Sequence, residues 1–264
     1  MHINYLYMLH WTNSISMLNP EAKILDYGCG SGNVVVAGRE KGFDIYGADV
    51  FYDGANSRKN VEKLNLLGNV IREIKQGKID FTDNTFDLVL SNQVFEHVED
   101  LESVLIEIHR VMKKDAVLLC LFPSKDVIRE GHIGIPFAHW LPKNSNLRYY
   151  YALTLREIGF GYFKGSKSKT QWTTDALNWI DKYTIYREKH EIFQIFSRYF
   201  EFKMIEEDCI EYRLSASPQK KLLSKLLKFP LLTEISRILF QKLAGMVIIA
   251  KKKEPSKARR SVIA

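Results

Sequence analysis

Cysteine is scarce in this chain, which has only Cys29, Cys120 and Cys209. Their odd number and wide spacing exclude a dense disulfide framework, and no Cys-x-x-Cys pair suggests a zinc or redox motif. The first 20 residues do not have the pattern of a secretory leader. We therefore expect a protein of the reducing cytoplasm.

Long apolar runs are lacking as well. No uninterrupted stretch approaches the roughly 18 to 20 residues that a membrane-spanning helix needs. The hydrophobic content of 46% and the charged content of 26% are nevertheless those of an ordinary folded protein. At 264 residues we expect a single domain, residues 1–264, made of one α/β unit with an elaboration.

Lysine and arginine exceed aspartate and glutamate by 38 − 31 = 7. Part of this excess lies in the last third of the chain, including a basic tail over residues 253–264. Such a region suits anionic lipid or phosphate, and it is equally typical of a solvated surface. Peripheral contact with the inner face of a membrane is therefore one of two open alternatives.

Segments typical of strands and helices alternate along the chain. After a leading helix over residues 3–18, the sequence predicts strands at 23–27, 44–50, 70–75, 86–91, 116–122, 200–206 and 245–251, and helices at 34–41, 55–67, 101–112 and 188–198. Strands that alternate with helices predict a parallel sheet with both faces covered. The fold class is therefore α/β, with a Rossmann-like, mostly parallel sheet of seven strands and helices on both faces.

Two segments interrupt this alternation. Residues 124–186 are rich in aromatic residues and histidine and follow the fifth strand, so we expect a substrate lid there. Residues 219–243 lie in the C-terminal part, 187–252, before the last strand, and they set Leu and Ile against Lys and Arg. This amphipathic insertion, interrupted by Pro230, can contact a membrane or can pack on the sheet or on a second subunit.

A glycine-rich turn follows the first predicted strand, in the run Asp26-Tyr27-Gly28-Cys29-Gly30-Ser31-Gly32. Glycines let a backbone approach a ligand closely and leave the N–H groups of the next helix pointing at it. A dinucleotide fingerprint would need glycine at position 33, where the chain has Asn33. Asp49 ends the second strand, where its carboxylate can accept two hydrogen bonds from a ribose diol.

A further motif follows along the chain in the run Asp83-Asn84-Thr85-Phe86-Asp87-Leu88-Val89-Leu90-Ser91-Asn92-Gln93-Val94-Phe95-Glu96-His97-Val98. Together with the glycine turn and Asp49, this run resembles the successive motifs of class I S-adenosylmethionine-dependent methyltransferases of the type 11 kind. The resemblance covers residues 20–123, the expected cofactor-binding core, and extends in topology over residues 188–251.

The resemblance implies roles for particular residues. Asp26, Gly28 and Gly30, within the turn that Gly32 ends, would line the methionine part of S-adenosylmethionine, and Asp49 would hold its ribose. The loop Gly77-Lys78-Ile79 would border the adenine, and Ser91 and Asn92 would face the methionine end. Many relatives have an aspartate after the third strand, whereas this loop reads Gln76-Gly77-Lys78-Ile79, so main-chain contacts would replace that aspartate.

Histidine is the natural base if the methyl acceptor is an alcohol. His97 follows the fourth strand, and His132 and His139 lie seven residues apart in the lid, near Phe137, Trp140 and Tyr149 to Tyr151. These aromatic rings could stack on a sugar, and the lid resembles a segment of methyltransferases of bacterial surface polysaccharides. The pair Glu96-His97 is similar to part of the site of metal-dependent quinone-pathway methyltransferases. Gln93 stands where a further carboxylate would complete that site, so no metal is expected.

These observations favour O-methylation of a sugar or glycan intermediate. The alternatives are a small-molecule methyltransferase for a quinone or natural product, and a non-catalytic cofactor-binding subunit of a glycan-assembly complex. Nucleic acid is not an expected substrate, because Ser91-Asn92-Gln93-Val94 replaces the Asn-Pro-Pro-Tyr type of motif. The sequence does not indicate an oligomeric state.

Overall fold

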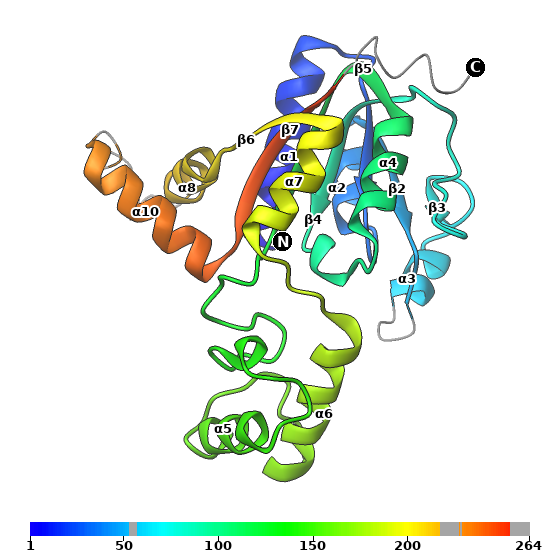
Figure 1. Cartoon of the computed structure of the whole chain (residues 1–264). Helices are drawn as coiled ribbons and strands as arrows, with labels where there is room; N and C mark the ends of the chain where they lie inside the picture. Colours follow the sequence, from blue (N-terminus) through cyan, green and yellow to red (C-terminus); the bar gives the residue numbers. More distant parts are fainter. Residues whose placement is uncertain (53–56, 217–226, 228, 254–264) are drawn as a thin grey trace, which may run out of the picture.

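The computed structural model describes residues 1–52, 57–216, 227 and 229–253. Its strands form one seven-stranded sheet in the order β3-β2-β1-β4-β5-β7-β6 (Figure 1). β7 runs antiparallel to both of its neighbours, and the other pairs are parallel. The predicted Rossmann-like, mostly parallel sheet is confirmed. The strands are β1 (Lys23–Tyr27), β2 (Asp44–Asp49), β3 (Ile71–Glu73), β4 (Phe86–Asn92), β5 (Met112–Phe122), β6 (Phe200–Met204) and β7 (Met246–Lys252).

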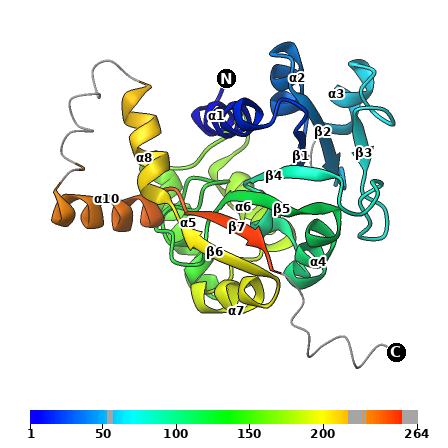
Figure 2. The ribbon, with the colours of Figure 1, turned by 90° about the horizontal axis from the view of Figure 1, so that it is seen from above.

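Helices cover both faces of the sheet, as Figure 2 shows from above. One face packs against α4 (Leu101–Val111) and α7 (Lys189–Tyr199), and the other against α1 (Ile3–Leu18), α2 (Asn33–Glu40) and α8 (Glu206–Ser215). α3 (Ser57–Lys63) packs beside α2 through Val61. Because β1, β2 and β4 are parallel neighbours, their carboxyl ends meet at one edge of the sheet.

Local sequence explains where these elements begin and end. The Asp100 side chain accepts a hydrogen bond from the Ser103 N–H and so caps α4. Leu101, Leu105 and Ile108 then recur at helical spacing and are buried against the sheet. β1 is buried after its first residue, which is typical of a central parallel strand that helices cover on both sides.

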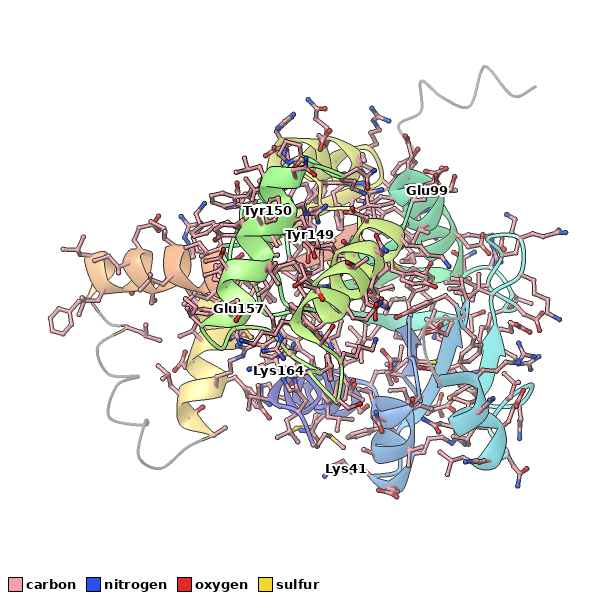
Figure 3. The ribbon with its side chains drawn as sticks, turned by 90° about the horizontal axis from the view of Figure 1, so that it is seen from below. Lys41, Glu99, Tyr149, Tyr150, Glu157 and Lys164 are labelled. Carbon is pink, nitrogen blue, oxygen red and sulfur yellow. The ribbon has the colours of Figure 1, made fainter. Side chains whose placement is uncertain are left out.

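The chain between β5 and α7 forms a helical lobe at the carboxyl end of the sheet. It contains the short helix η2 (Ala138–Trp140), α5 (Asn146–Glu157) and α6 (Lys169–Tyr183), with its own apolar cluster around Ile135, Trp172 and Ile180. Figure 3 shows α5, which carries Tyr149, Tyr150 and Glu157, lying beside α6. We call this lobe, residues 124–186, the lid.

The segment before β7 differs from its prediction in two ways. Helical structure already begins with α8, directly after β6, and Pro230 starts α10 (Pro230–Leu243) instead of interrupting a helix. Proline is favoured at the first position of a helix because its missing N–H would have no partner there. Four lysines of the predicted amphipathic insertion, Lys220, Lys221, Lys225 and Lys228, lie outside the described residues, and so does the tail beyond residue 253. Across the residues that the structure does describe, no helix has the length and apolar character needed to span a bilayer.

Candidate functional site

The glycine turn after β1 packs against Val94, which lies just beyond the end of β4. Gly28, Gly30 and Gly32 all have positive φ angles, of 75°, 53° and 77°. A Cβ atom on Gly28 would lie 2.3 Å from Cγ2 of Val94, so only glycine fits at this crossing. The N–H of Gly28 donates to the carbonyl of Ala48 over 2.7 Å, which ties the turn to the end of β2.

Asp49 holds this turn from the end of β2. Its Oδ2 accepts a hydrogen bond from the Gly30 N–H over 2.8 Å, and its Oδ1 accepts one from the Phe51 N–H over 2.7 Å. Burial raises the pKa of Asp49, against the effect of these hydrogen bonds. Each oxygen of a carboxylate has a second lone pair, so the side chain can still accept hydrogen bonds from a diol.

A cavity of about 530 Å³ opens at this end of the sheet, which is within the range of small-molecule sites. Of the residues predicted to bind the cofactor, Asp26, Gly28, Gly30, Asp49 and Asn92 line it. His97 also lines it, close to the lid residue Tyr183. We call this space the first cavity.

The remaining predicted cofactor residues do not line the first cavity. Ser91 is buried in the sheet, and Gly32 packs near Ile71. The loop Gly77-Lys78-Ile79 turns instead toward α4, where the Ile79 N–H and the Lys78 ammonium both contact Glu107. Ile74 is the residue from the end of β3 that lines the cavity, so it is better placed to border an adenine than the predicted loop is.

Asp26 is a buried acidic residue in the wall of the first cavity. Burial, reinforced by the Asp49 carboxylate, raises the pKa of Asp26 to about 7. A buried acid with no cationic partner stabilises an ammonium group that enters its cavity. Asp26 is therefore suited to an amino acid moiety.

The N-terminal helix contributes to the cavity in a way that the sequence did not indicate. His2, Asn4 and Tyr5 line the first cavity. The Asn4 side-chain amide donates to Oδ1 of Asn92 over 3.0 Å, across 88 positions of the chain. No local motif marks these residues, because their role depends on how α1 packs across the end of β4.

A second cavity, of about 870 Å³, lies within the lid. Aromatic rings supply much of its wall, and Tyr52 borders both cavities. The sequence predicted an aromatic wall, but from residues that do not line this cavity. Phe137 and Trp140 pack on each other, and Tyr149 lies on α5. The second cavity is lined by Tyr52, Gly131, His132, Ile133, Tyr162, Phe163, Lys167, Trp172, Asp175, Ala176 and Trp179.

Two of the three histidines that the sequence offered as candidate bases meet at the junction of the cavities. His97 belongs to the short helix η1 (Phe95–His97) and lines the first cavity, whereas His132 lines the second. Their Nε2 atoms are 3.2 Å apart. Trp179 lies over His132 with a centroid distance of 5.1 Å, so an aromatic wall covers the pair.

A buried carboxylate that the sequence did not single out supports His132. Glu130 Oε1 lies 2.7 Å from His132 Nδ1 and accepts a hydrogen bond from the Tyr186 hydroxyl over 2.6 Å. Burial opposes the charged imidazole, but the hydrogen bond and charge of Glu130 outweigh it and raise the pKa of His132. Burial lowers the pKa of His97.

His139 is not brought to this junction. Its Nε2 lies 3.1 Å from the Lys125 carbonyl, its ring packs 4.4 Å from that of Tyr186, and it lines neither cavity. These contacts are those of a residue that packs within the lid, and they give no support to the prediction of His139 as a base.

A family model described as a methyltransferase domain matches residues 2–164. The ubiquinone biosynthesis O-methyltransferase of Rickettsia conorii is 26% identical over 180 residues, which cover 61% of this chain and 59% of that protein. The Rickettsia typhi protein of the same name is 27% identical over 146 residues, covering 52% and 55%. The chain thus spans less than two thirds of the length of these relatives.

The fold is also that of a solved methyltransferase. An S-adenosylmethionine-dependent methyltransferase from Mesorhizobium loti superposes with a TM-score of 0.50 over 93% of this chain and 98% of that one, at 14% identity. At this identity the similarity concerns the fold alone. With the match to the family model, it shows that this chain belongs to the class I S-adenosylmethionine-dependent methyltransferases.

Proposed function

We propose that this methyltransferase transfers the methyl group of S-adenosylmethionine to a hydroxyl oxygen of a small aromatic acceptor, a phenol or a quinol. The observation that carries the proposal is the aromatic second cavity, which meets the first cavity at Tyr52 and at the His97–His132 pair. The cofactor occupies the first cavity and the acceptor occupies the second.

The walls of the second cavity favour an aromatic ring over a sugar. Trp172, Trp179 and Tyr162 offer ring faces and edges suited to stacking. Recognition of a sugar would need several convergent polar groups, but Lys167 and Asp175, two charged residues of the wall, form an ion pair over 2.6 Å. The sugar or glycan acceptor that the sequence favoured is therefore replaced by its small-molecule alternative.

The curated relatives support the same acceptor class. Those from Rickettsia conorii and Rickettsia typhi bear the name ubiquinone biosynthesis O-methyltransferase. Ubiquinone precursors are aromatic compounds, so the name agrees with the walls of the second cavity. Because this chain matches only part of each relative, the acceptor is inferred from the cavity and the names together.

Methyl transfer itself asks little covalent chemistry of the protein. The acceptor oxygen attacks the methyl carbon, the carbon–sulfur bond breaks, and the sulfonium becomes a neutral thioether while the hydroxyl proton is lost. Alignment of the oxygen and the methyl group and exclusion of water are the main requirements. The proton must leave close to His97 and His132, the imidazoles that separate the two cavities.

Binding of acceptor analogues tests this proposal. The protein, saturated with S-adenosylhomocysteine, is titrated by calorimetry with a catechol and with a monosaccharide. We expect heat from the catechol only, and we expect Trp179→Leu to weaken it. Trp140→Leu is the matched control, because Trp140 lines neither cavity. Binding of the sugar in preference to the catechol would contradict the proposal.

A further inference from the structure

Glu96, His97 and His132 form a compact cluster of potential metal ligands at the junction of the cavities. One ligand atom from each lies within 4.8 Å of the other two. Glu96 and His97 come from η1 at the end of β4, and His132 comes from the lid. Glu96 is 1% exposed, and neither of its carboxylate oxygens has a hydrogen-bond partner among the described residues.

The hydrogen bonds of the two imidazoles fix where their protons are. His97 Nδ1 lies 2.6 Å from the carbonyl oxygen of Tyr183, which can only accept, so this nitrogen carries a proton. His132 Nδ1 lies 2.7 Å from the Glu130 carboxylate and carries one for the same reason. In neutral imidazoles both Nε2 atoms are then bare, and their lone pairs meet at 3.2 Å.

Two lone pairs at this separation are stabilised either by a proton that the two nitrogens share or by a metal ion that both of them bind. Nitrogens that bind one tetrahedral zinc ion at about 2.0–2.1 Å are about 3.3–3.4 Å apart, close to the separation found here. The buried Glu96 carboxyl group lies beside them, and its two oxygens accept no hydrogen bond from the described residues. A buried carboxyl group of this kind either keeps its proton or pairs with a cation, and a metal ion bound by the two imidazoles would be such a cation.

The surroundings are also those of a metal site. Histidines that bind metals donate their other ring N–H to a carboxylate or a backbone carbonyl, as His132 and His97 do toward Glu130 and Tyr183. Glu130 is itself fixed by Tyr186 and by the Ile133 N–H. Three protein ligands leave a further position for a substrate oxygen.

We propose that Glu96, His97 and His132 bind a divalent transition-metal ion, with zinc as the preferred probe. His132 takes the place of the carboxylate that Gln93 cannot provide, and so the lid supplies a ligand. Two imidazoles with one carboxylate favour zinc and its first-row neighbours over magnesium, which prefers oxygen. When bound, such an ion lowers the pKa of a coordinated hydroxyl.

Zinc binding is measured by calorimetry on the chelator-treated full chain, with no acceptor present. We expect one zinc ion per chain and little binding of magnesium. Glu130→Gln weakens only the hydrogen-bond support for His132, so it should lower zinc affinity by about 10- to 100-fold. Glu96→Gln and His132→Ala each remove a ligand and should lower zinc affinity further. His190→Ala, which removes an exposed histidine of α7, is the control and should bind like the wild type.

Binding of S-adenosylhomocysteine by each variant shows that it is folded. Wild-type affinity for zinc in a folded His132→Ala variant would overturn the proposal. If that variant fails to fold, cobalt in the wild type decides the question: intense visible bands of a four- or five-coordinate ion support the site, and the weak bands of hydrated cobalt overturn it. Because no acceptor enters these measurements, they are independent of the proposed methylation of an aromatic hydroxyl.

Discussion

The Nε2 atoms of His97 and His132 lie 3.2 Å apart across 35 positions of the chain. His97 lies beyond the end of β4 and His132 lies in the lid, so their contact links the lid to the sheet beside the first cavity. His132 also lines the second cavity, within the lid. Under the proposed function, an acceptor in the second cavity would bring its oxygen toward the cofactor at this contact.

Asp49 is expected to determine cofactor affinity. Asp49→Ala removes the acceptor of the Gly30 and Phe51 N–H groups. It also removes the carboxylate that we expect to bind the ribose hydroxyls. Hydrogen bonds to a charged group contribute about 1.5–3 kcal/mol, so S-adenosylhomocysteine should bind about 10- to 100-fold more weakly in calorimetry. Asp87→Ala is the matched control, because Asp87 also accepts a backbone N–H, that of Lys23, but lies outside the cavity. Equal losses in both variants would mean that Asp49 acts only through stability.

Asp26 is expected to make the free protein less stable as the pH rises. Its pKa is raised from 3.8 to about 7 by burial and by Asp49, so between these values the folded chain holds a proton that the unfolded chain has lost. Stability therefore falls as the pH rises through this window. Asparagine cannot ionise, so the stabilisation gained by Asp26→Asn should be greater at pH 8 than at pH 5 by about 2–3 kcal/mol.

Urea unfolding of the cofactor-free wild type and Asp26→Asn at the two pH values measures this difference. The same variant should bind S-adenosylhomocysteine more weakly at pH 8, because it lacks the charge that faces the ammonium group. A stability difference between the proteins that does not change with pH would show that Asp26 ionises normally in the folded state.

Trp179 is expected to affect the acceptor more than the cofactor. Its ring lies against His132 and lines the second cavity, and aromatic pairs contribute about 0.5–1.5 kcal/mol beyond their buried area. Trp179→Leu should therefore raise the KM for a phenolic acceptor by about two- to tenfold or more, with unchanged affinity for S-adenosylhomocysteine. A loss confined to cofactor affinity would place the acceptor elsewhere.

The exposed face of α10 is expected to bind anionic vesicles weakly. Leu231, Ile235, Ile238 and Leu239 share one stripe of this helix and are 72%, 44%, 46% and 54% exposed, and Figure 1 shows α10 projecting from the sheet. Changing Leu231, Ile235 and Leu239 to Ser should lower recovery in liposome flotation, and added salt should weaken any contribution from cations. If neither protein floats, the stripe covers another protein surface instead.

The sheet and the glycine turn could be predicted because their signals are local. Strand and helix periods follow one another in order, and Gly28, Gly30 and Asp49 fall at the ends of neighbouring parallel strands, which meet at one edge. The predicted strand ends differ from the observed ones by a few residues, as at β5, which already begins at Met112, because α4 leads into it without a loop.

The acceptor side could not be predicted in the same detail. Nothing in the sequence pairs His132 with His97, because their contact depends on how the lid folds back over the sheet. Trp172 and Trp179 form the wall in place of Phe137 and Trp140 for the same reason. Glu130 is recognisable only from its burial and from the hydrogen bonds that it accepts, and both are properties of the folded chain.

The most direct test of the account follows the methyl group itself. The protein is incubated with S-adenosylmethionine carrying a ¹³C-labelled methyl group and with an equimolar mixture of a catechol and a sugar, and the products are separated by mass spectrometry and identified by NMR. The account predicts that the label appears as an aryl methyl ether, dependent on the protein and reduced in Trp179→Leu. Label found only on the sugar, in a reaction that the wild-type protein catalyses, would contradict it.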